Sequence, residues 1–561
     1  MEKVESTNKH TLFPNEQSVI SLDFQEEEKL IARTIDKFIQ EHVNPSIKNL
    51  EAYDYELAKK LFRDAGDLGL LGADVPELYD GMELGKKTAG LVAERMGYGA
   101  SFSVSFNIHT GVGTLPYVYF GTPEQKERYL PKLVSGEWVG AYALTEPNAG
   151  SDALASETSA VLDEKSGEWV LNGEKQWITN AHIASVFVVF AKTESGITAF
   201  IVERSMSGVS IGLEEKKMGI KGSSTATLIL ENVRLSTDQV LGQIGKGHYI
   251  ALNILNLARL KLAFANVGTA KQALSLAVNY GKARKQFKQE LTRFTMIQEK
   301  LANMALAIFA SECAAYVAAN RLDELHVNSS NEDDILGKLS NYAVDCSINK
   351  VYASEALDFI VDEALQIHGG YGYMQEYEVE RLYRDARINR LFEGTSEINR
   401  LTIVRSFLKL YNKDKSIIEQ DETQTHSQNL YIHYSKELLN IIMKAFSNSD
   451  NVVLKQDQEI QRMLADVIKE IYVMESVQLT AQATRSNQDL KETMAEVLCE
   501  EGYFGIERNA VVIISSIISN DDKKQAFLDE INNFTLPMYS NLVAKKRKIA
   551  MEVISNNGYK K

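Results

Sequence analysis

The distribution of proline constrains the fold of this chain more than any other sequence feature. The 561-residue sequence has eight prolines, and none occurs between Pro147 and Pro537. Proline lacks a backbone N–H group and breaks the interior of a helix. Long helices can therefore run without interruption through most of the chain.

Length and composition indicate a multidomain globular protein. A chain of 561 residues is too long for one compact core, and 44% hydrophobic residues supply ample material for several. The formal net charge of -15 argues against a nucleic-acid binder. Only Cys313, Cys346 and Cys499 occur, far apart and without a CxxC pair, so we expect neither a disulfide framework nor a metal site.

The sequence shows no targeting or membrane-spanning signal. Its first ten residues contain acidic side chains and no apolar core, which excludes a secretory signal and disfavours a transit peptide. The longest conspicuous apolar run, Ala510 to Ile518, is far shorter than the roughly 20 residues that a membrane-spanning helix needs. We therefore expect a cytoplasmic protein of a reducing compartment.

Hydrophobic spacing divides the chain into blocks. Apolar residues recur at helical spacing on both sides of a block that holds short β-branched runs separated by Gly and Asn turns. A polar stretch near residue 420 is typical of a linker. The predicted organisation is an N-terminal extension (1–22), a helical domain (23–140), a middle β domain (141–248), a helical bundle (249–411), a linker (412–430) and a C-terminal helical domain (431–561).

Some elements can be placed within these blocks. Gly121 to Leu130 predicts a helix with Thr122 as its cap and Pro123 at its first position. Residues 185–192, 197–203 and 225–233 predict strands. Turn chemistry interrupts the helical pattern near Asn328 to Asp334 and in the segments HGGYGYM and EGTS.

The segment RLFEGTSEINR, Arg390 to Arg400, contains the carboxylate that most suggests chemistry. Glu393 is followed by Gly394 on a turn between two helical segments, where a side chain can be aimed into a cavity as a base. The alternative is an ordinary connection between helices, with Thr395 or Ser396 as an N-cap. The segment alone does not decide between these interpretations.

Five motifs in order resemble the acyl-CoA dehydrogenase family over roughly Asp23 to Leu408. They are YALTEPNAGSDA (142–153), KQWITN (175–180), ARKQF (283–287), QIHGGYGY (366–373) and RLFEGTSEINR. The segment EKKMGIKGSSTA (215–226) and the helical region after residue 411 are similar to the very-long-chain branch. The resemblance implies a mainly α fold with a central β domain: an N-terminal α domain, a middle β-barrel-like domain, a C-terminal four-helix bundle and an extra C-terminal helical domain.

The resemblance also implies FAD as cofactor, and several motifs suit a flavin physically. Turn residues and hydroxyls in ALTEPNAGSD can hydrogen-bond the flavin and its pyrophosphate, and an indole can cover the ring system. A polar turn and a core tryptophan are the structural alternatives. The residues that the family would place against FAD are Tyr142, Leu144, Thr145, Gly150, Ser151, Trp177, Ile178, Thr179, Arg284, Phe287, Gln366, Ile367, Gly369, Gly370, Thr395 and Glu397.

Two of these residues imply a homodimer. In the family, the residues that match Arg284 and Phe287 reach the FAD of the neighbouring subunit. Gln366, Gly369 and Gly370 would meet the adenine end, where glycines let the backbone approach closely. For Arg284 alone, a solvated helix face or an ion pair is the ordinary interpretation.

For the reaction, the family uses the residue at Glu393 as the base that removes the α-proton of an acyl-CoA, while the β-hydrogen leaves as hydride for flavin N5. A minority of the family carries the base at the position of Ala258, and alanine cannot abstract a proton. The implied substrate-binding residues are Ser151, Leu252, Asn256, Arg259 and Gly394. For Leu252, Asn256 and Arg259, the alternative is an ordinary helix surface.

Chain length and membrane contact depend on weaker patterns. Phe106 to Thr114 aligns with the floor of the acyl pocket, where Gly111 and Gly113 would leave room for a long chain or would only permit close helix packing. The basic run Lys545 to Lys548 suggests peripheral contact with an anionic membrane or is a solvated face.

The predicted function is α,β-desaturation of a long-chain acyl-CoA to trans-2-enoyl-CoA in fatty acid β-oxidation, with an electron-transfer flavoprotein as acceptor. Two alternatives stay open. An acyl-CoA oxidase shares the fold and the base but lets oxygen reach the reduced flavin. A flavin-binding assembly or interaction protein would use its tail as the working surface.

Overall fold

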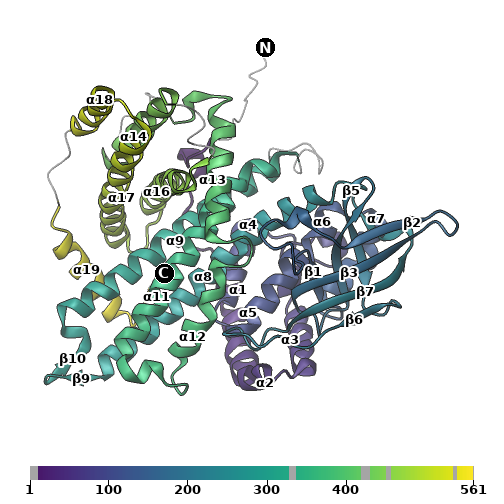
Figure 1. Ribbon diagram of the computed structural model, residues 1–561. Helices are drawn as coiled ribbons and strands as arrows, with labels where there is room; N and C mark the ends of the chain where they lie inside the picture. Colours follow the sequence, from purple (N-terminus) through teal and green to yellow (C-terminus); the bar gives the residue numbers. More distant parts are fainter. Residues whose placement is uncertain (1–10, 328–336, 419–429, 450–455, 535–539, 560–561) are drawn as a thin grey trace, which may run out of the picture.

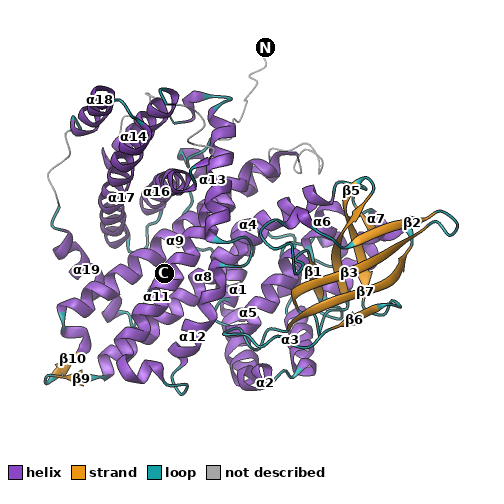
Figure 2. Cartoon of the chain, viewed as in Figure 1, coloured by secondary structure: helices purple, strands orange, loops and turns teal. Residues whose placement is uncertain are grey.

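The computed structural model describes residues 11–327, 337–418, 430–449, 456–534 and 540–559 (Figure 1). The turn predicted near Asn328 to Asp334 and most of the predicted linker lie outside these ranges. Helices dominate the chain, and one sheet interrupts them at one side of the molecule (Figure 2). All three cysteines are buried, and none is in a disulfide.

The N-terminal block is helical, as predicted. Its helices are α1 (Glu26–Phe38), α2 (Ile47–Glu51), α3 (Tyr55–Asp67), α4 (Lys86–Met96), α5 (Ala100–Ile108), α6 (Leu115–Phe120) and α7 (Pro123–Val134). At the start of α7, the Thr122 hydroxyl accepts a hydrogen bond from the Gln125 backbone N–H at 3.3 Å, which confirms the predicted cap. The helix continues past the predicted end at Leu130, with Pro131 inside it.

The middle block forms an eight-stranded, mostly antiparallel sheet in the order β6-β7-β3-β2-β4-β5-β8, with β1 parallel to β4. The three predicted strands are confirmed as β4, β5 and β7. β3 was not predicted, because Glu and Lys side chains interrupt its apolar alternation. The strands are β1 (Gly140–Ala143), β2 (Ser159–Asp163), β3 (Glu168–Thr179), β4 (Val186–Thr193), β5 (Gly196–Glu203), β6 (Val209–Ile211), β7 (Thr225–Leu235) and β8 (Val240–Leu241).

Long helices follow and form the predicted bundle: α8 (Gly247–Ala283), α9 (Thr295–Val327), α11 (Ala343–His368), α12 (Glu378–Ala386) and α13 (Ser396–Tyr411). A two-stranded hairpin, β9 (Lys285–Gln286) and β10 (Gln289–Glu290), joins α8 to α9. By length and composition α8 and α9 are apolar enough to span a membrane, but the apolar stretch of each is mostly buried inside the fold. Helices that are apolar all round are typical of the centre of a large core.

The C-terminal helices are α14 (Leu430–Ser447), α16 (Gln458–Ala483), α17 (Gln488–Ile517), α18 (Asp521–Asn532) and α19 (Leu542–Ser555). They do not form a core of their own. α16 packs against α9 and α13, α19 packs against α9, and their buried side chains continue the core of the bundle. The described part of the N-terminal extension joins the same core through the buried side chains of Leu12, Phe13 and Leu22. The backbone N–H of Leu22 also donates a hydrogen bond to Thr484 Oγ1 at 3.1 Å.

The basic run of α19 is neutralised within the protein. Lys545 pairs with Glu496 at 2.8 Å, Lys546 with Glu501 at 2.5 Å and Lys548 with Asp489 at 2.6 Å, and all three acids belong to α17. These side chains therefore fasten α19 to α17. These pairs favour the alternative of a solvated face for the basic run, and the membrane contact stays a prediction.

Candidate active site

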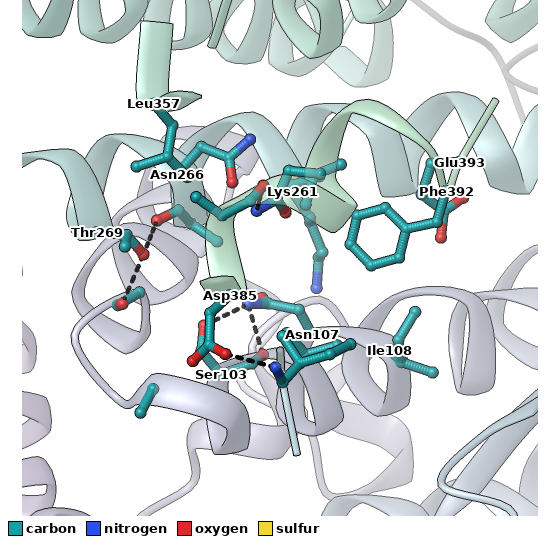
Figure 3. A pocket seen from close by; sticks show the side chains of 18 of the residues that line it. Ser103, Asn107, Ile108, Lys261, Asn266, Thr269, Leu357, Asp385, Phe392 and Glu393 are labelled. Carbon is teal, nitrogen blue, oxygen red and sulfur yellow. Dashed lines mark hydrogen bonds between the residues drawn. The ribbon is translucent and has the colours of Figure 1, made fainter. Parts of the chain in front are cut away.

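A cavity lies where α5, α8 and α12 meet (Figure 3). From α5 it is lined by residues at helical spacing, and from α8 by a second set at the same spacing, so each helix turns one face toward it. Phe392 and Glu393 close one side. The lining residues are Gly97, Ala100, Ser103, Val104, Asn107, Ile108, Ile220, Ala258, Lys261, Leu262, Ala265, Asn266, Thr269, Leu357, Leu382, Asp385, Ala386, Asn389, Phe392 and Glu393.

The turn that carries Glu393 has an unusual backbone. Glu393 has φ 55° and Gly394 has φ 84°, so two successive residues are left-handed just before α13. A bulky residue in this region is strained, and such strain clusters at functional sites. A side chain at Gly394 would also approach Asn399 Nδ2 at 3.1 Å and Arg259 Nη2 at 3.4 Å. The turn therefore requires glycine after the glutamate.

Two polar side chains hold this turn in place. Arg259 Nε donates to the Glu393 backbone carbonyl at 3.0 Å, and Asn399 Nδ2 donates to the Gly394 carbonyl at 2.8 Å. Asn256, which was predicted to bind substrate with Arg259, accepts a hydrogen bond from Arg259 Nη1 at 2.8 Å. Both residues are buried outside the cavity lining, so they position Glu393. Leu252 lies exposed nearer the start of α8.

The Glu393 carboxylate is incompletely paired, and its pKa is shifted toward neutrality. Its Oε2 atom is enclosed and has no hydrogen-bond partner among the described residues. Burial raises the pKa of Glu393 to about 7, although the positive charges of Arg259 and Lys350 pull it down. A carboxylate with a pKa near neutrality takes up and releases protons readily. Ala258, the position of the minority base, lines the same cavity and offers no rival group.

Lys350 of α11 is a second buried charge beside this site. Its side chain is fully buried, and its Nζ atom has no hydrogen-bond partner in the described part of the chain. Burial lowers the pKa of Lys350 to about 8, while the charge of Glu393 partly opposes that shift. The charges of Glu393 and Lys350 thus affect each other's pKa, as does the charge of Arg259, although no hydrogen bond joins the two side chains.

The first group of predicted FAD residues lies at the edge of the sheet next to this site. The Tyr142 hydroxyl donates to the Ala251 carbonyl of α8 at 3.4 Å, and Thr145 accepts from Gln176 N–H at 2.9 Å through its carbonyl. Gly150 and Ser151 are exposed, with open space beside Gly150, whereas Leu144 is buried. A buried ion pair between Lys175 and Glu146 braces the loop that carries these residues.

Trp177 is turned out of the sheet by a β-bulge. The register of β3 against β7 shifts between Lys175 and Ile178, and Trp177 between them has φ 58°. Its indole is 58% exposed, which is unusual for tryptophan and leaves a flat apolar face uncovered. Thr179 is half-buried. The Ile178 side chain points into the core of the β domain, so only its backbone is available to a cofactor.

The second group of predicted FAD residues lies far from the first. Phe287 and Lys288 are the two central residues of the β9–β10 turn, with φ 48° and 66°. Two left-handed residues suit such a hairpin, but phenylalanine is strained there, and its ring is 87% exposed. Figure 1 shows this hairpin and the sheet at opposite sides of the molecule. A strained turn that projects an exposed ring is typical of a contact surface.

The turn after α11 belongs to this second group. The Arg284 guanidinium lies 5.5 Å from the centre of the Tyr371 ring, which brings ARKQF and HGGYGY together. Gly369 has φ 61° and, like Gly370, faces open space, so the backbone is accessible there. Gln366 is exposed, whereas the Ile367 side chain is buried in the core. One chain therefore divides the predicted FAD residues between two distant surfaces.

The remaining predicted residues have local structural roles. Thr395 caps α13, since its hydroxyl accepts from the Ile398 N–H at 3.2 Å, and Glu397 is exposed in the first turn of that helix. A side chain at Gly113 would lie 2.9 Å from the Gly140 backbone, which supports the close-packing alternative for this glycine. Gly111 faces Lys261, and neither glycine lines the cavity.

Several polar residues that shape the cavity lie outside the motifs. Asn266 and Lys261 each stand in a mostly apolar stretch of α8, and that isolation is the signal by which the sequence could have drawn attention to them. Asp385 follows Arg384 on α12, and its carboxylate accepts a hydrogen bond from the Ile220 N–H. This bond ties the 212–224 loop, which includes part of EKKMGIKGSSTA, to α12 at the cavity wall.

Comparison with known families covers nearly every block of the chain. Models of the acyl-CoA dehydrogenase N-terminal domain (25–137), middle domain (141–233) and C-terminal domain (245–408) match in order. A further model, also described as an acyl-CoA dehydrogenase C-terminal domain, matches residues 442–531. The extra helices are therefore a recognised part of this architecture.

Individual proteins agree with these models. A probable acyl-CoA dehydrogenase of Bacillus subtilis is 41% identical over 96% of this chain and 95% of its own length. The mitochondrial very-long-chain specific acyl-CoA dehydrogenase of Homo sapiens is 37% identical over 67% of this chain, which spans 56% of that relative. A crystal structure of acyl-CoA dehydrogenase complexed with FAD from Bacillus anthracis has a TM-score of 0.92 and 40% identity, covering 99% of this chain and 98% of its own. The chain thus belongs to the acyl-CoA dehydrogenase family of FAD-dependent oxidoreductases.

Proposed function

We propose that this protein desaturates an acyl-CoA between its α and β carbons, with Glu393 as the general base. The observation that carries this proposal is the Glu393 carboxylate: it faces the cavity, its Oε2 atom is unpaired among the described residues, and its pKa is raised to about 7. A structural carboxylate would be paired or exposed instead.

The chain's own groups account for the proton transfer. Glu393 takes the α-proton, and the electron pair left on the α-carbon forms the new double bond as the β-hydrogen departs with its own electron pair. Bound FAD supplies the acceptor for that hydride. An acyl-CoA bound in the cavity would displace water from beside Glu393, which strengthens hydrogen bonds to the developing enolate oxygen. Arg259 and Asn399 keep the base in register by holding the carbonyls of the 393–394 turn.

The residues present fit FAD. The uncovered Trp177 indole offers an apolar face to a flat ring system, and the exposed loop at Gly150 and Ser151 offers backbone and hydroxyl groups. Gly369 and Gly370 leave open space for close approach by a ligand beside Arg284. Because these two groups lie at opposite sides of one chain, a homodimer in which each FAD contacts both copies explains the arrangement. We include that dimer in the proposal.

A long acyl chain and an electron-transfer flavoprotein as acceptor complete the proposed function, with a role in fatty acid β-oxidation. The support for the long chain is the similarity to very-long-chain relatives, whose whole length this chain does not span. Gly113 gives no support, because its lack of a side chain serves packing against Gly140.

An anaerobic titration tests the proposal. Purified protein is mixed with palmitoyl-CoA while the flavin absorbance is recorded, and we expect the oxidised band to bleach. Absence of flavin, or a band that does not change with any acyl-CoA, would overturn the proposal in favour of a non-enzymatic assembly role. Turnover in air that yields one peroxide per enoyl-CoA would indicate an oxidase instead.

A further inference from the structure

One isoleucine in the cavity wall has a backbone conformation that its side chain disfavours. Ile220 has φ 47°, in the left-handed region, and its side chain is buried and lines the cavity. A β-branched residue in this region is a genuine outlier, whereas glycine adopts the same conformation without strain. Such strain persists only where the surrounding structure enforces it, and it clusters at ligand sites. The contacts around Ile220 therefore show what this strain serves.

Two neighbouring residues of α12 hold the loop that carries Ile220. The Asp385 carboxylate accepts a hydrogen bond from the Ile220 backbone N–H, and Arg384 Nη1 donates to the Met218 carbonyl at 3.1 Å. Between these two bonds, a side chain at Gly219 would collide with the Arg384 carbonyl, so the loop backbone lies directly against α12. The loop is thus fastened to α12 on both sides of Gly219.

The loop is fixed from α5 as well. The Ser223 N–H donates to the Ile220 carbonyl at 3.1 Å, and Ser105 Oγ of α5 donates to Ser223 Oγ at 3.0 Å. Both backbone polar groups of Ile220 are therefore hydrogen-bonded. The Met218 side chain is 59% exposed, whereas that of Ile220 is 7% exposed. Of these two apolar side chains, the loop turns only the isoleucine toward the cavity.

Ile220 meets the cavity away from the catalytic base. Figure 3 shows Asp385, which binds the Ile220 backbone, well separated from Glu393. The chain from Asp385 to Arg390 stays helical, so a rise of about 1.5–2 Å per residue places this part of the wall roughly 10 Å from the Glu393 turn. A straight acyl chain advances about 1.3 Å per carbon–carbon bond. A hexanoyl chain that starts at Glu393 is then too short to reach Ile220, whereas a palmitoyl chain is long enough.

We propose that Ile220 determines specificity for the distal part of the acyl chain, and that Asp385 and Arg384 are positioning residues that hold it against the cavity. The inference rests on the proposed desaturation at Glu393 and deepens it. The isoleucine side chain contacts the methylene groups of a bound chain and so favours chains that are long enough to reach it. The hydrogen bonds from α12 keep the isoleucine in its strained conformation.

The test compares the FAD-loaded wild type with Ile220→Gly on hexanoyl-CoA and palmitoyl-CoA. Glycine removes the side chain and relieves the strain. The ratio of kcat/KM for palmitoyl-CoA to that for hexanoyl-CoA, measured by flavin reduction, should therefore fall by about tenfold. This ratio does not depend on the fraction of enzyme that is folded and holds FAD. An unchanged or higher ratio would overturn the proposal. Failure of the wild type to reduce its flavin with any acyl-CoA would instead overturn the proposed function.

Met218→Gly is the matched control. Met218 lies in the same loop and gains the same backbone freedom on replacement by glycine, but its side chain is exposed and does not line the cavity. Its ratio should equal that of the wild type. A fall as large as in Ile220→Gly would mean that the freedom of the loop sets the ratio, which would contradict a role for the isoleucine side chain.

The positioning residues are tested with the same ratio. Asp385→Ala removes the acceptor for the Ile220 N–H and should lower the ratio nearly as far as Ile220→Gly, with little further fall in the double variant. Asp385→Asn should keep the wild-type ratio, because its amide oxygen can still accept that hydrogen bond. Burial already raises the pKa of Asp385 to about 6, so a neutral group suits this position.

Arg384→Met gives a second measurement, which decides the matter should Asp385→Ala lose its FAD. It removes only the bond to the Met218 carbonyl, so the ratio should fall by less than in Asp385→Ala. A wild-type ratio in every variant of Asp385 and Arg384 that retains FAD would overturn their positioning role.

Discussion

Two buried lysines of the helical bundle show how differently this protein treats charge in its core and at its active site. Lys271 of α8 is 3% exposed and lies between two carboxylates, Glu94 at 2.8 Å and Glu312. Those acids are bound in turn by Tyr316 and Tyr559, each at 2.8 Å or less. Burial alone would lower the pKa of Lys271, but the carboxylates of Glu312 and Glu94 raise it well above its ordinary value. We call these five residues the Lys271 cluster.

Lys350 of α11 is buried as deeply but has no such partners. Its Nζ lacks a hydrogen bond among the described residues, and its pKa falls to about 8. The carboxylate that feels its charge, Glu393, has an unpaired oxygen and a raised pKa. In the Lys271 cluster the ammonium group is paired with two carboxylates, whereas Lys350 Nζ and Glu393 Oε2 have no hydrogen-bond partner among the described residues. Incomplete pairing at a cavity is the arrangement expected where a ligand and a proton transfer will supply the missing interactions.

Replacing Glu393 with Gln gives the largest expected effect. Glutamine keeps the size of the side chain but cannot accept the α-proton, so the rate of flavin reduction by palmitoyl-CoA should fall by several powers of ten. Bound FAD should be retained, because the neighbouring turn is held through backbone carbonyls. Stopped-flow absorbance measures the rate. Near-normal flavin reduction by Glu393→Gln would place the base elsewhere. The unpaired charges of Glu393 and Lys350 would then have no catalytic role.

Removal of Lys271 should mainly affect stability. Lys271→Met leaves Glu94 and Glu312 buried without their cation, and loss of one partner from a buried pair costs about 3–5 kcal/mol. Denaturant unfolding of the variant against the wild type measures that loss. At temperatures where the variant stays folded, its flavin reduction rate should match the wild type. A much slower rate in the folded variant would mean that the Lys271 cluster is also part of the catalytic machinery.

Glu393→Gln should also stabilise the folded protein at high pH. Folded Glu393 binds its proton more tightly than the unfolded chain does, so the wild-type free energy of unfolding falls as pH rises from about 4.5 to about 7. In the Gln variant, this decrease in the free energy of unfolding with rising pH does not occur. We expect it to be more stable than the wild type by up to about 3 kcal/mol at pH 8 and by much less at pH 5. An equal difference at both pH values would show that the carboxylate is not destabilised by burial.

The sequence predicted more of the architecture than of the electrostatics. The blocks of helices and strands follow from apolar spacing and from the proline-free stretch, and Thr122 and Pro123 marked the start of α7 correctly. β3 escaped prediction because its charged residues hide the alternation. The sequence predicted helices over residues 431–561 but not that they share the core of the bundle, since spacing along one helix does not reveal which other helix covers its apolar face.

For the site, motifs identified Glu393 and its glycine, but they could not show which groups surround the carboxylate. Asn256 and Arg259 were predicted to bind substrate, which stays a prediction, and the sequence did not show that Arg259 also holds the turn through the Glu393 carbonyl. Asn107 and Asn266 come from helices far apart in sequence, and only the packing of α5 against α8 brings them to one cavity, while Lys350 of α11 affects the pKa of Glu393 from outside the cavity lining. Burial and the absence of partners, which set the pKa values, are properties of that packing.

The smallest predicted effect tests whether the charge of Lys350 acts on Glu393. Lys350→Met removes one of the two positive charges that lower the pKa of Glu393, leaving Arg259. Glu393 should then stay protonated to higher pH, so the pH at which flavin reduction reaches half its maximal rate should rise, and the loss of rate should be larger at pH 6 than at pH 8. Lys271→Met is the matched control, because it also removes a buried lysine of the bundle but lies in the paired cluster, and its pH profile should not move. An equal fall in the flavin reduction rate at every pH would contradict this prediction. It would mean that Lys350 supports the fold without acting on the charge of Glu393, and that Lys350 and Lys271 differ only in how they are packed.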